Sequence, residues 1–340
     1  MVIESVWHMG HVPRRPFDAP HVADWPTVQE WLPATVPGNV RSDLLAQGHI
    51  PDPTAGLNYR HSRWVEDVDW WYRRRVTLNP LPPEGRAFLI FHGIDYLSAI
   101  FVNGREVARH AGMFSRQTIE VTEAARAGAF DLAVRLWGSG ALPRRRLSGL
   151  QKAWQFWGQK LYRSWVGIYP DRTATLKCQM SFGWDFAPPV RAMGIWDDVE
   201  LRRTGPLAIR DWQISGGTGG DPVAVTLWLN SARPTPAQAE ITLIPANFRG
   251  DSPPPAHFSL RLPAGQSRVT LRCPASGLKP WQPWERGLPH LYTARVSLTG
   301  PDGRRLDSVD CRTGFRVASW KDGQLSVNGR SIFARGLNWV

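Results

Sequence analysis

The chain has 340 residues, of which 42% are hydrophobic and 21% are charged, and this composition excludes both a single small module and a disordered chain. Its formal net charge of +12 raises the possibility of a nucleic-acid partner, because basic surfaces gain free energy by releasing counterions from nucleic acid. Nearly all the basic residues are arginines dispersed among 29 acidic residues, in runs no longer than three, so we expect no nucleic-acid partner.

Short segments rich in β-branched and aromatic residues, separated by Gly, Pro, Asn and Asp, dominate the chain. Long stretches with helical periodicity are scarce, and this pattern indicates an all-β fold. Strands are predicted over residues 71–78, 87–91, 99–102, 130–136, 223–229, 239–244 and 292–298. One short helix is predicted over residues 41–47, with Ser42 and Asp43 in its first turn.

Asn-Gly pairs mark two predicted β-hairpins. Asn103-Gly104 and Asn328-Gly329 each separate two short apolar runs. A type I′ turn requires positive φ angles at both central residues, and the Asn-Gly pair adopts them readily. Each pair therefore predicts two adjacent antiparallel strands.

A domain boundary is predicted near Gly205-Pro206, between two strand-like segments. The following unit of about 110 residues has the size and strand spacing of an immunoglobulin-like sandwich. From Leu325 a third element begins, and the sequence ends on the apolar Val340. An unpaired strand edge is unfavourable, so we interpret this end as a truncation inside a further domain.

The first fifteen residues contain no apolar segment like the core of a signal peptide. No apolar run reaches the roughly 18–20 residues that a membrane span needs. We therefore expect a cytoplasmic protein with no membrane partner.

Cysteine and histidine spacing offers no disulfide framework and no metal motif. Cys178, Cys273 and Cys311 are odd in number and far apart, so we predict reduced thiols, most of them buried. His8 and His11 have no third ligand nearby, so no metal site is predicted. Nucleotide-binding fingerprints are missing from the sequence, and no cofactor is expected.

Two groups of carboxylates are candidates for acid–base chemistry. Glu66, Asp67 and Asp69 precede a tryptophan pair, and Asp197-Asp198 follows another tryptophan. We interpret both groups as solvated turn residues at the starts of strands.

One loop carries a stronger signal. Trp184-Asp185 precedes Pro188-Pro189 in an irregular segment. An indole offers a flat apolar face that can stack on a sugar ring, and an adjacent carboxylate can accept hydrogen bonds from sugar hydroxyls. A sugar-binding loop and a buried tryptophan beside a turn aspartate explain these residues equally well.

Nine short motifs occur in order along the chain. They are Pro37-Gly38-Asn39-Val40 with Asp43-Leu44-Leu45, Ile50-Pro51-Asp52-Pro53, Trp70-Trp71-Tyr72-Arg73, Phe91-His92-Gly93-Ile94-Asp95, Phe101-Val102-Asn103-Gly104, Phe182-Gly183-Trp184-Asp185, Gly194-Ile195-Trp196, Gly314-Phe315-Arg316, and Val327-Asn328-Gly329 through Ala334-Arg335-Gly336-Leu337-Asn338-Trp339. In this order and spacing the chain resembles glycoside hydrolase family 2, specifically its β-mannosidase branch, over essentially its whole length.

The resemblance implies three domains. Residues 1–204 would form a jelly-roll, galactose-binding-like domain, and residues 205–318 an immunoglobulin-like sandwich. Residues 319–340 would open a (β/α)₈ barrel, whose chemistry lies at the carboxyl ends of its strands. The two catalytic glutamates of the family would lie beyond Val340, so the resemblance implies no catalytic residue in this chain.

The resemblance also implies four substrate-binding residues. The loop of the first domain would contact the terminal sugar through Trp184 and Asp185, and the first barrel strand through Asn338 and Trp339. Phe186 and Ala187 depart from the Trp-Gly that is usual in the family before the proline.

The implied function is that of the N-terminal, non-catalytic part of a retaining exo-β-mannosidase that acts on a carbohydrate substrate and needs the missing barrel in cis. An exo-β-glucosaminidase or another enzyme of the family is the alternative, and a free-standing lectin-like protein is the alternative of another class. The sequence does not fix the sugar.

Overall fold

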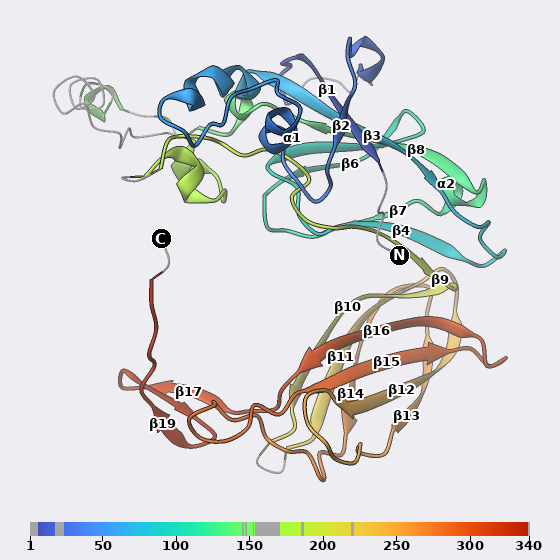
Figure 1. The fold of residues 1–340 in the computed structure, drawn as a ribbon. Coiled ribbons are helices and arrows are strands. Elements are labelled where there is room, and N and C mark those ends of the chain that lie inside the picture. The colour runs from blue at the N-terminus through green and yellow to red at the C-terminus, as the bar shows by residue number, and fades with distance from the viewer. Residues whose placement is uncertain are drawn as a thin grey trace. The chain divides into compact units, whose positions relative to one another are not determined.

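The computed structural model describes residues 6–17, 24–144, 146, 148–151, 153, 171–184, 187–218 and 221–338. The chain forms two compact units, Met1–Arg202 and Arg203–Val340 (Figure 1). Within the described residues each unit is built mainly from antiparallel strands, as the spacing of turn residues predicts. None of the helices in these ranges is long and apolar enough to cross a bilayer.

The first unit is a sandwich of two sheets. Its larger sheet has the order β2 (Leu32–Ala34), β1 (Trp7–Pro13), β3 (Val68–Thr77), β8 (Ala129–Leu136), β5 (Leu97–Val102) and β6 (Arg105–Ala111), and its smaller sheet has the order β7 (Gln117–Glu120), β4 (Arg86–Phe91) and β9 (Val199–Thr204). One buried cluster holds side chains of both sheets, among them Tyr72 of β3 and Leu89 of β4. This arrangement confirms the jelly-roll fold.

The larger sheet is covered on both faces, which accounts for part of the tryptophan content. Successive side chains of a strand point to opposite faces. Trp70 and Tyr72 therefore lie in the cluster between the sheets, whereas Trp71 packs on the other face with Phe101 and Trp137. The first half of β3 is buried on both faces and therefore carries the uninterrupted run Trp70-Trp71-Tyr72, whereas Arg73 and Arg75 in its second half are exposed.

Helices are short and few in the described ranges. The predicted helix is α1 (Val40–Ala46), and the Asn39 side chain caps it by accepting a hydrogen bond from the Ser42 amide at 3.0 Å. A second helix, α2 (Thr122–Arg126), precedes β8. The 3₁₀ helices are Trp25–Thr27, Asn58–Glu66, Ser139–Ala141, Arg172–Ala174 and Gln179–Phe182.

Both Asn-Gly hairpins are confirmed. Asn103 and Gly104 have φ angles of 48° and 83° and join β5 to β6. Asn328 and Gly329 have φ angles of 51° and 75° and join β18 (Gln324–Val327) to β19 (Arg330–Ile332). These are the positive φ angles that a type I′ turn requires.

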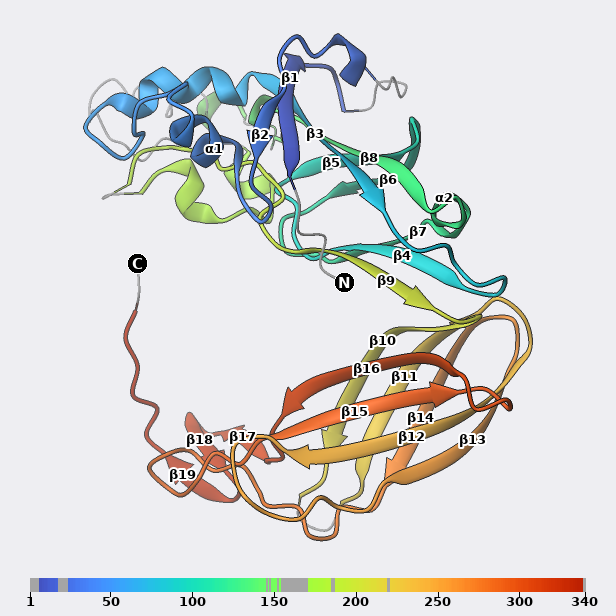
Figure 2. The same ribbon diagram turned by 45° about the vertical axis from the view of Figure 1, so that its right-hand side comes forward.

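The second unit contains an immunoglobulin-like sandwich (Figure 2). One sheet has the order β10 (Leu207–Gly216), β11 (Val223–Ser231) and β14 (Gly265–Cys273), and the other has the order β13 (Ala256–Leu262), β12 (Thr235–Pro245), β15 (Tyr292–Thr299) and β16 (Arg305–Thr313). Burial alternates strictly along β11, and a single cluster joins Leu227 of β11 to Val296 of β15. This is the pattern of two half-buried sheets that face each other.

A small three-stranded sheet follows the sandwich. Its strands are β17 (Ala318–Lys321), β18 and β19. Asn328 fixes the sheet to the preceding chain, because its side chain accepts a hydrogen bond from the Val317 amide at 3.0 Å and donates one to the Trp281 carbonyl at 2.9 Å. The Asn328 side chain therefore serves the hairpin turn and its attachment at once.

The expectation that most cysteines are buried is wrong. All three thiols are free, but only Cys273 is buried, while Cys311 is partly exposed and Cys178 is exposed. Cys178 directly follows Lys177, whose side chain is buried and forms an ion pair with Asp95. The chain at this point turns the lysine inward, and the cysteine faces solvent.

Candidate functional site

Trp184 lies at the start of a short turn that closes on itself. Its amide donates a hydrogen bond to the Ala187 carbonyl at 3.0 Å, and the Ala187 amide returns one to the Trp184 carbonyl at 3.3 Å. Gly183, with a φ of 94°, turns the chain against Pro189. The Trp184 side chain is half-buried, and Asp185 lies outside the described residues.

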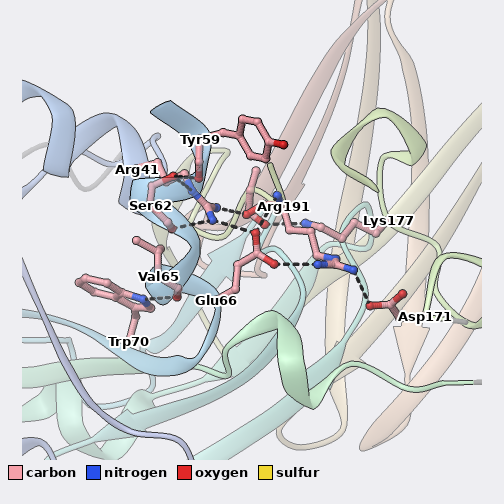
Figure 3. Close-up of polar contacts among 10 residues, drawn as sticks. Arg41, Tyr59, Ser62, Val65, Glu66, Trp70, Asp171, Lys177 and Arg191 are labelled. Atoms are coloured by element: carbon pink, nitrogen blue, oxygen red, sulfur yellow. Dashed lines mark hydrogen bonds and ion pairs between the residues drawn. The ribbon is translucent and has the colours of Figure 1, made fainter. Parts of the chain in front are cut away.

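Arg191 and Glu66 hold the segment that follows the turn, residues 187–192, which we call the returning arm of the loop (Figure 3). The Arg191 guanidinium donates to Glu66 Oε2 at 2.7 Å, and the Arg191 amide donates to Glu66 Oε1 at 3.3 Å. Arg41 of α1 donates to the same Oε1 at 2.8 Å and also to the Arg191 carbonyl. Glu66 therefore joins the loop to α1, the helix between β2 and β3 in the chain.

The Arg191 guanidinium also holds the segment that precedes the turn, residues 171–184, which we call the outgoing arm of the loop. Its other terminal nitrogen donates to Asp171 Oδ2 at 3.0 Å, and its carbon lies 5.1 Å from the centre of the Phe182 ring. Phe182 is fully buried in the cluster on the outer face of the larger sheet. Arg191 thus contacts one residue two positions before Trp184 and another at the start of the described part of the loop.

A second ion pair is more deeply buried than the first. Lys177 donates to a carboxylate oxygen of Asp95 and to the Ala192 carbonyl, the latter at 2.6 Å. The side chains of Lys177 and Asp95 are 1% and 2% exposed. This contact joins the outgoing arm to the returning arm and to the chain before β5.

Burial governs the protonation equilibria at this second pair. It raises the pKa of Asp95 and lowers the pKa of Lys177, because it penalises the charged form of each group. The attraction between the two groups opposes both shifts. The attraction between the two groups therefore favours the charged form of each against the cost of burial.

The arginine Arg172 lies over the indole of Trp184. Its guanidinium carbon is 5.0 Å from the ring centre, within the range of a cation–π contact. Its Nε also donates to Gln179 Oε1 at 2.8 Å. The side chain is thus fixed at two points, one of which is the predicted sugar-stacking residue.

Two of the candidate carboxylates for acid–base chemistry, Glu66 and Asp69, lie in structural positions. Asp69 is fully buried and accepts hydrogen bonds from Arg135 at 2.6 Å and from the Gly138 amide at 2.9 Å. The expectation that these groups are solvated turn residues is wrong for Asp69 and for Glu66, because arginines accompany both into the interior. Only Asp67 is exposed.

Neither histidine near the N-terminus belongs to a metal site among the described residues. These ranges contain no group of three or more His, Cys, Asp or Glu side chains that could hold a metal ion. His11 instead contacts the rings of Trp64 and Trp70, at centroid distances of 5.4 and 5.3 Å.

The remaining predicted substrate-binding residues belong to the second unit. Asn338 is exposed beyond β19, and Trp339 lies outside the described residues. Trp184 belongs to the first unit, so each of these residues is placed only within its own unit. A substrate-binding role for the four residues stays a prediction.

Sequence reasoning missed the residues that hold the loop. Arg191, Lys177 and Asp171 carry no motif, and their partners are far away along the chain. One signal was present, since Lys177 and Arg191 flank an aromatic and diproline segment that has few other polar anchors. Charged residues on both sides of an irregular loop are candidates for its attachment points.

Gly194 provides a test of how tightly the loop returns to the sandwich. A Cβ atom at this position would lie 2.5 Å from the Gly38 carbonyl oxygen and 2.7 Å from the Asn39 Cα. Both are backbone atoms that cannot move aside, so Gly194→Ala is expected to lower the free energy of unfolding by about 1–3 kcal/mol. Thermal and urea unfolding of the 340-residue chain measure this effect.

The matched control is Gly149→Ala in the same unit, where a Cβ would meet no atom within 4 Å. This control is expected to change the unfolding free energy by less than about 0.5 kcal/mol. Equal stability of the Gly194→Ala variant and the wild type would refute the close approach.

Two family profiles match the chain. One, described as the glycosyl hydrolase 2 galactose-binding domain-like family, matches residues 20–197. The other, described as glycosyl hydrolases family 2, matches residues 223–316. The two matched ranges lie in the jelly-roll and the immunoglobulin-like sandwich.

Individual relatives agree with these matches. The chain is 27% identical over 323 residues to beta-mannosidase B of Thermothelomyces thermophilus, covering 92% of this chain and 36% of that protein. A crystal structure of β-D-mannosidase from Dictyoglomus thermophilum is similar with a TM-score of 0.77 and 25% identity, over 100% of this chain and 40% of that one. Exo-chitosanase CsxA of Amycolatopsis orientalis shares the fold, with a TM-score of 0.67, 21% identity, and coverage of 92% and 34%. The chain thus spans little more than a third of the length of the relatives it matches.

Proposed function

Because this chain belongs to glycosyl hydrolase family 2, we propose that it is the N-terminal part of a retaining exo-β-mannosidase that releases terminal β-D-mannosyl residues. The observation that carries this proposal is the likeness to proteins named beta-mannosidase over 92% of the chain. The relatives are about two and a half times as long, which leaves room for a catalytic domain after the two sandwiches.

The proposed domains are residues 1–204, 205–318 and 319–340, the last being the start of a (β/α)₈ barrel. A retaining mechanism needs a nucleophile and an acid–base residue, two carboxyl groups about 5–5.5 Å apart. We place both in the barrel beyond Val340. In this chain the proposed roles belong to Trp184, Asp185, Asn338 and Trp339, which would line the subsite for the terminal sugar.

The loop geometry supports a recognition role for Trp184. The half-buried indole lies on a closed turn, and buried ion pairs hold the chain on both sides of this turn to other parts of the first unit. A rigid apolar face loses little conformational entropy when a sugar stacks on it. The proposed partner is accordingly the non-reducing end of an oligosaccharide.

The alternative substrate within the family is a terminal β-glucosaminyl residue. One solved structure with the same fold is titled as a complex of exo-chitosanase CsxA with PNP-β-D-glucosamine. Comparing nitrophenyl β-mannoside with nitrophenyl β-glucosaminide as substrates of the complete protein separates the two. Faster hydrolysis of the glucosaminide would reject the mannosidase proposal while keeping the family.

The 340-residue chain by itself is expected to show no glycosidase activity, since it would lack the catalytic carboxylate pair. An assay of the purified chain with nitrophenyl β-mannoside tests this expectation, with the complete protein as the positive control. Turnover that survives repurification of the short chain would contradict the placement of catalysis in the barrel. A stop codon after Val340 would instead favour a free-standing carbohydrate-binding protein.

A further inference from the structure

We propose that Arg172 is a positioning residue for Trp184, which it holds at the tilt required for stacking on a sugar. This inference rests on the proposed function in one respect only, namely that Trp184 contacts the substrate. The contact between Arg172 and Trp184 stands on the geometry of the first unit alone.

The first step is the contact between the two side chains. The guanidinium carbon of Arg172 is 5.0 Å from the indole centre. A planar guanidinium over an aromatic face is attracted by the ring quadrupole and also packs against it, which a lysine ammonium does less well. With Arg172 on one face of the indole, a sugar ring can stack only on the opposite face.

The second step is the attachment of Arg172. Its Nε donates to Gln179 Oε1 at 2.8 Å, so the guanidinium is held from the side while it covers the ring. Gln179 in turn donates to the Lys177 carbonyl at 3.0 Å. The cation is therefore fixed to the same arm of the loop that leads to Trp184.

The third step is the pair of contacts through which Asp171 and Arg191 hold the loop. Asp171, which precedes Arg172, is 2% exposed and accepts a hydrogen bond from Arg191 at 3.0 Å. Arg191 also bonds to Glu66 (Figure 3). Its guanidinium covers the ring of Phe182, two residues before Trp184. The Arg191 guanidinium thus contacts Asp171, next to Arg172, and Phe182, close to Trp184. It thereby positions the chain on both sides of the contact between Arg172 and Trp184.

Two alternatives explain why an arginine lies here. Arg172 could contact the sugar itself, or it could serve only the stability of the loop. A positioning residue differs from both because its effect on the substrate disappears when Trp184 is absent. A double-mutant cycle measures this difference directly.

The first experiment needs no substrate. The 340-residue chain is labelled with 5-fluorotryptophan, and its ¹⁹F resonance for Trp184 is assigned by its loss in Trp184→Phe. Arg172→Gln is expected to shift and broaden this resonance, because the ring loses the cation that covers it. Asp171→Asn is expected to shift the Trp184 resonance in the same direction, because it weakens the contact between residue 171 and Arg191.

The matched control is Arg268→Gln in the second unit. Arg268 lies 5.2 Å from the ring centre of Trp228, a contact of the same kind. This variant is expected to move the Trp228 resonance and to leave that of Trp184 in place. An unchanged Trp184 resonance in folded Arg172→Gln would overturn the proposal, whatever the enzyme acts on.

The second experiment uses the complete protein and its β-mannoside substrate. Arg172→Gln is expected to raise KM about threefold to tenfold with kcat changed less than about twofold, the pattern of a lost binding contact. In the Trp184→Leu background, Arg172→Gln is expected to change kcat/KM by less than about twofold. Additive effects would overturn the positioning role and indicate a separate contact with the sugar.

The two experiments fail in different ways. If Trp184→Leu alone leaves kcat/KM unchanged, the proposed role of Trp184 in substrate binding is wrong, and the ¹⁹F result still decides the contact with Arg172. If Arg172→Gln lowers the melting temperature and kcat together in both backgrounds, Arg172 serves stability and the positioning role is rejected.

Discussion

Lys177→Met is expected to destabilise the first unit by about 3–5 kcal/mol, because it leaves the carboxylate of Asp95 buried without its cation. The Asp95 side chain is 2% exposed, and among the described residues its Oδ1 already has no hydrogen-bond partner. Methionine nearly matches the length of lysine, so the cavity term is small and the lost charge dominates. Urea unfolding of the 340-residue chain measures the difference.

The pH dependence of this variant distinguishes charge from packing. Burial raises the pKa of Asp95 above 3.8, and loss of the lysine cation raises it further. The folded variant therefore binds a proton at pH values where the unfolded chain does not, so this group contributes stability as pH falls through its folded-state pKa. The difference in unfolding free energy between Lys177→Met and the wild type is therefore expected to narrow as the pH falls from neutrality toward the ordinary pKa of an aspartate.

Two controls accompany the variant. Arg126→Met removes a surface pair with Glu123, whose side chain is 91% exposed, and is expected to cost less than about 1 kcal/mol. The double variant Lys177→Met with Asp95→Leu removes both charges and is expected to be more stable than the sum of its single changes implies. A cost for Lys177→Met below that of Arg126→Met would show that the buried pair is unimportant for stability.

The fold could be predicted from the sequence because its signals are local. Asn103-Gly104 and Asn328-Gly329 determine their turns through backbone preferences of two adjacent residues. The core segments of β3, β11 and β15 are visible as apolar runs or alternations, and the observed bounds of each strand differ from the predicted ones by at most three residues. Turn and strand preferences of this kind can be recognised in the sequence without knowing the tertiary contacts.

The support of the loop could not be predicted, because its contacts are distant in sequence. Lys177 meets Asp95 across 82 positions, and Arg191 meets Glu66 across 125. Carboxylates near strand ends are most often solvated, so composition alone assigned Glu66 to the surface. Only the tertiary fold brings an arginine from each side onto the same carboxylate and makes its burial favourable.

Buried ion pairs and apolar packing have different consequences for such a loop. Apolar contacts can slide with small changes in free energy, whereas a buried charge is stable only in the geometry that satisfies it. Arg191 and Lys177 therefore select one path for the segment that carries Trp184. The buried ion pairs therefore fix the backbone of the segment from which the partly exposed indole extends.

Asp185→Ala in the complete protein is expected to lower kcat/KM about tenfold to a hundredfold. In the proposed substrate subsite this carboxylate would accept hydrogen bonds from the terminal sugar, so its loss would leave sugar hydroxyl groups unpaired in a desolvated subsite. Hydrogen bonds to a charged group contribute about 1.5–3 kcal/mol each, and 1.4 kcal/mol corresponds to a factor of ten. Steady-state kinetics with nitrophenyl β-mannoside measure the loss.

The matched control is Asp67→Ala, which removes an exposed carboxylate of the same unit and is expected to leave both kcat/KM and the melting temperature unchanged. An aspartate that only caps the diproline turn gives the opposite pattern for Asp185→Ala, a lower melting temperature with kcat/KM nearly intact. That outcome would remove Asp185 from the substrate site. It would leave Trp184 as the one proposed substrate-binding residue of the first unit.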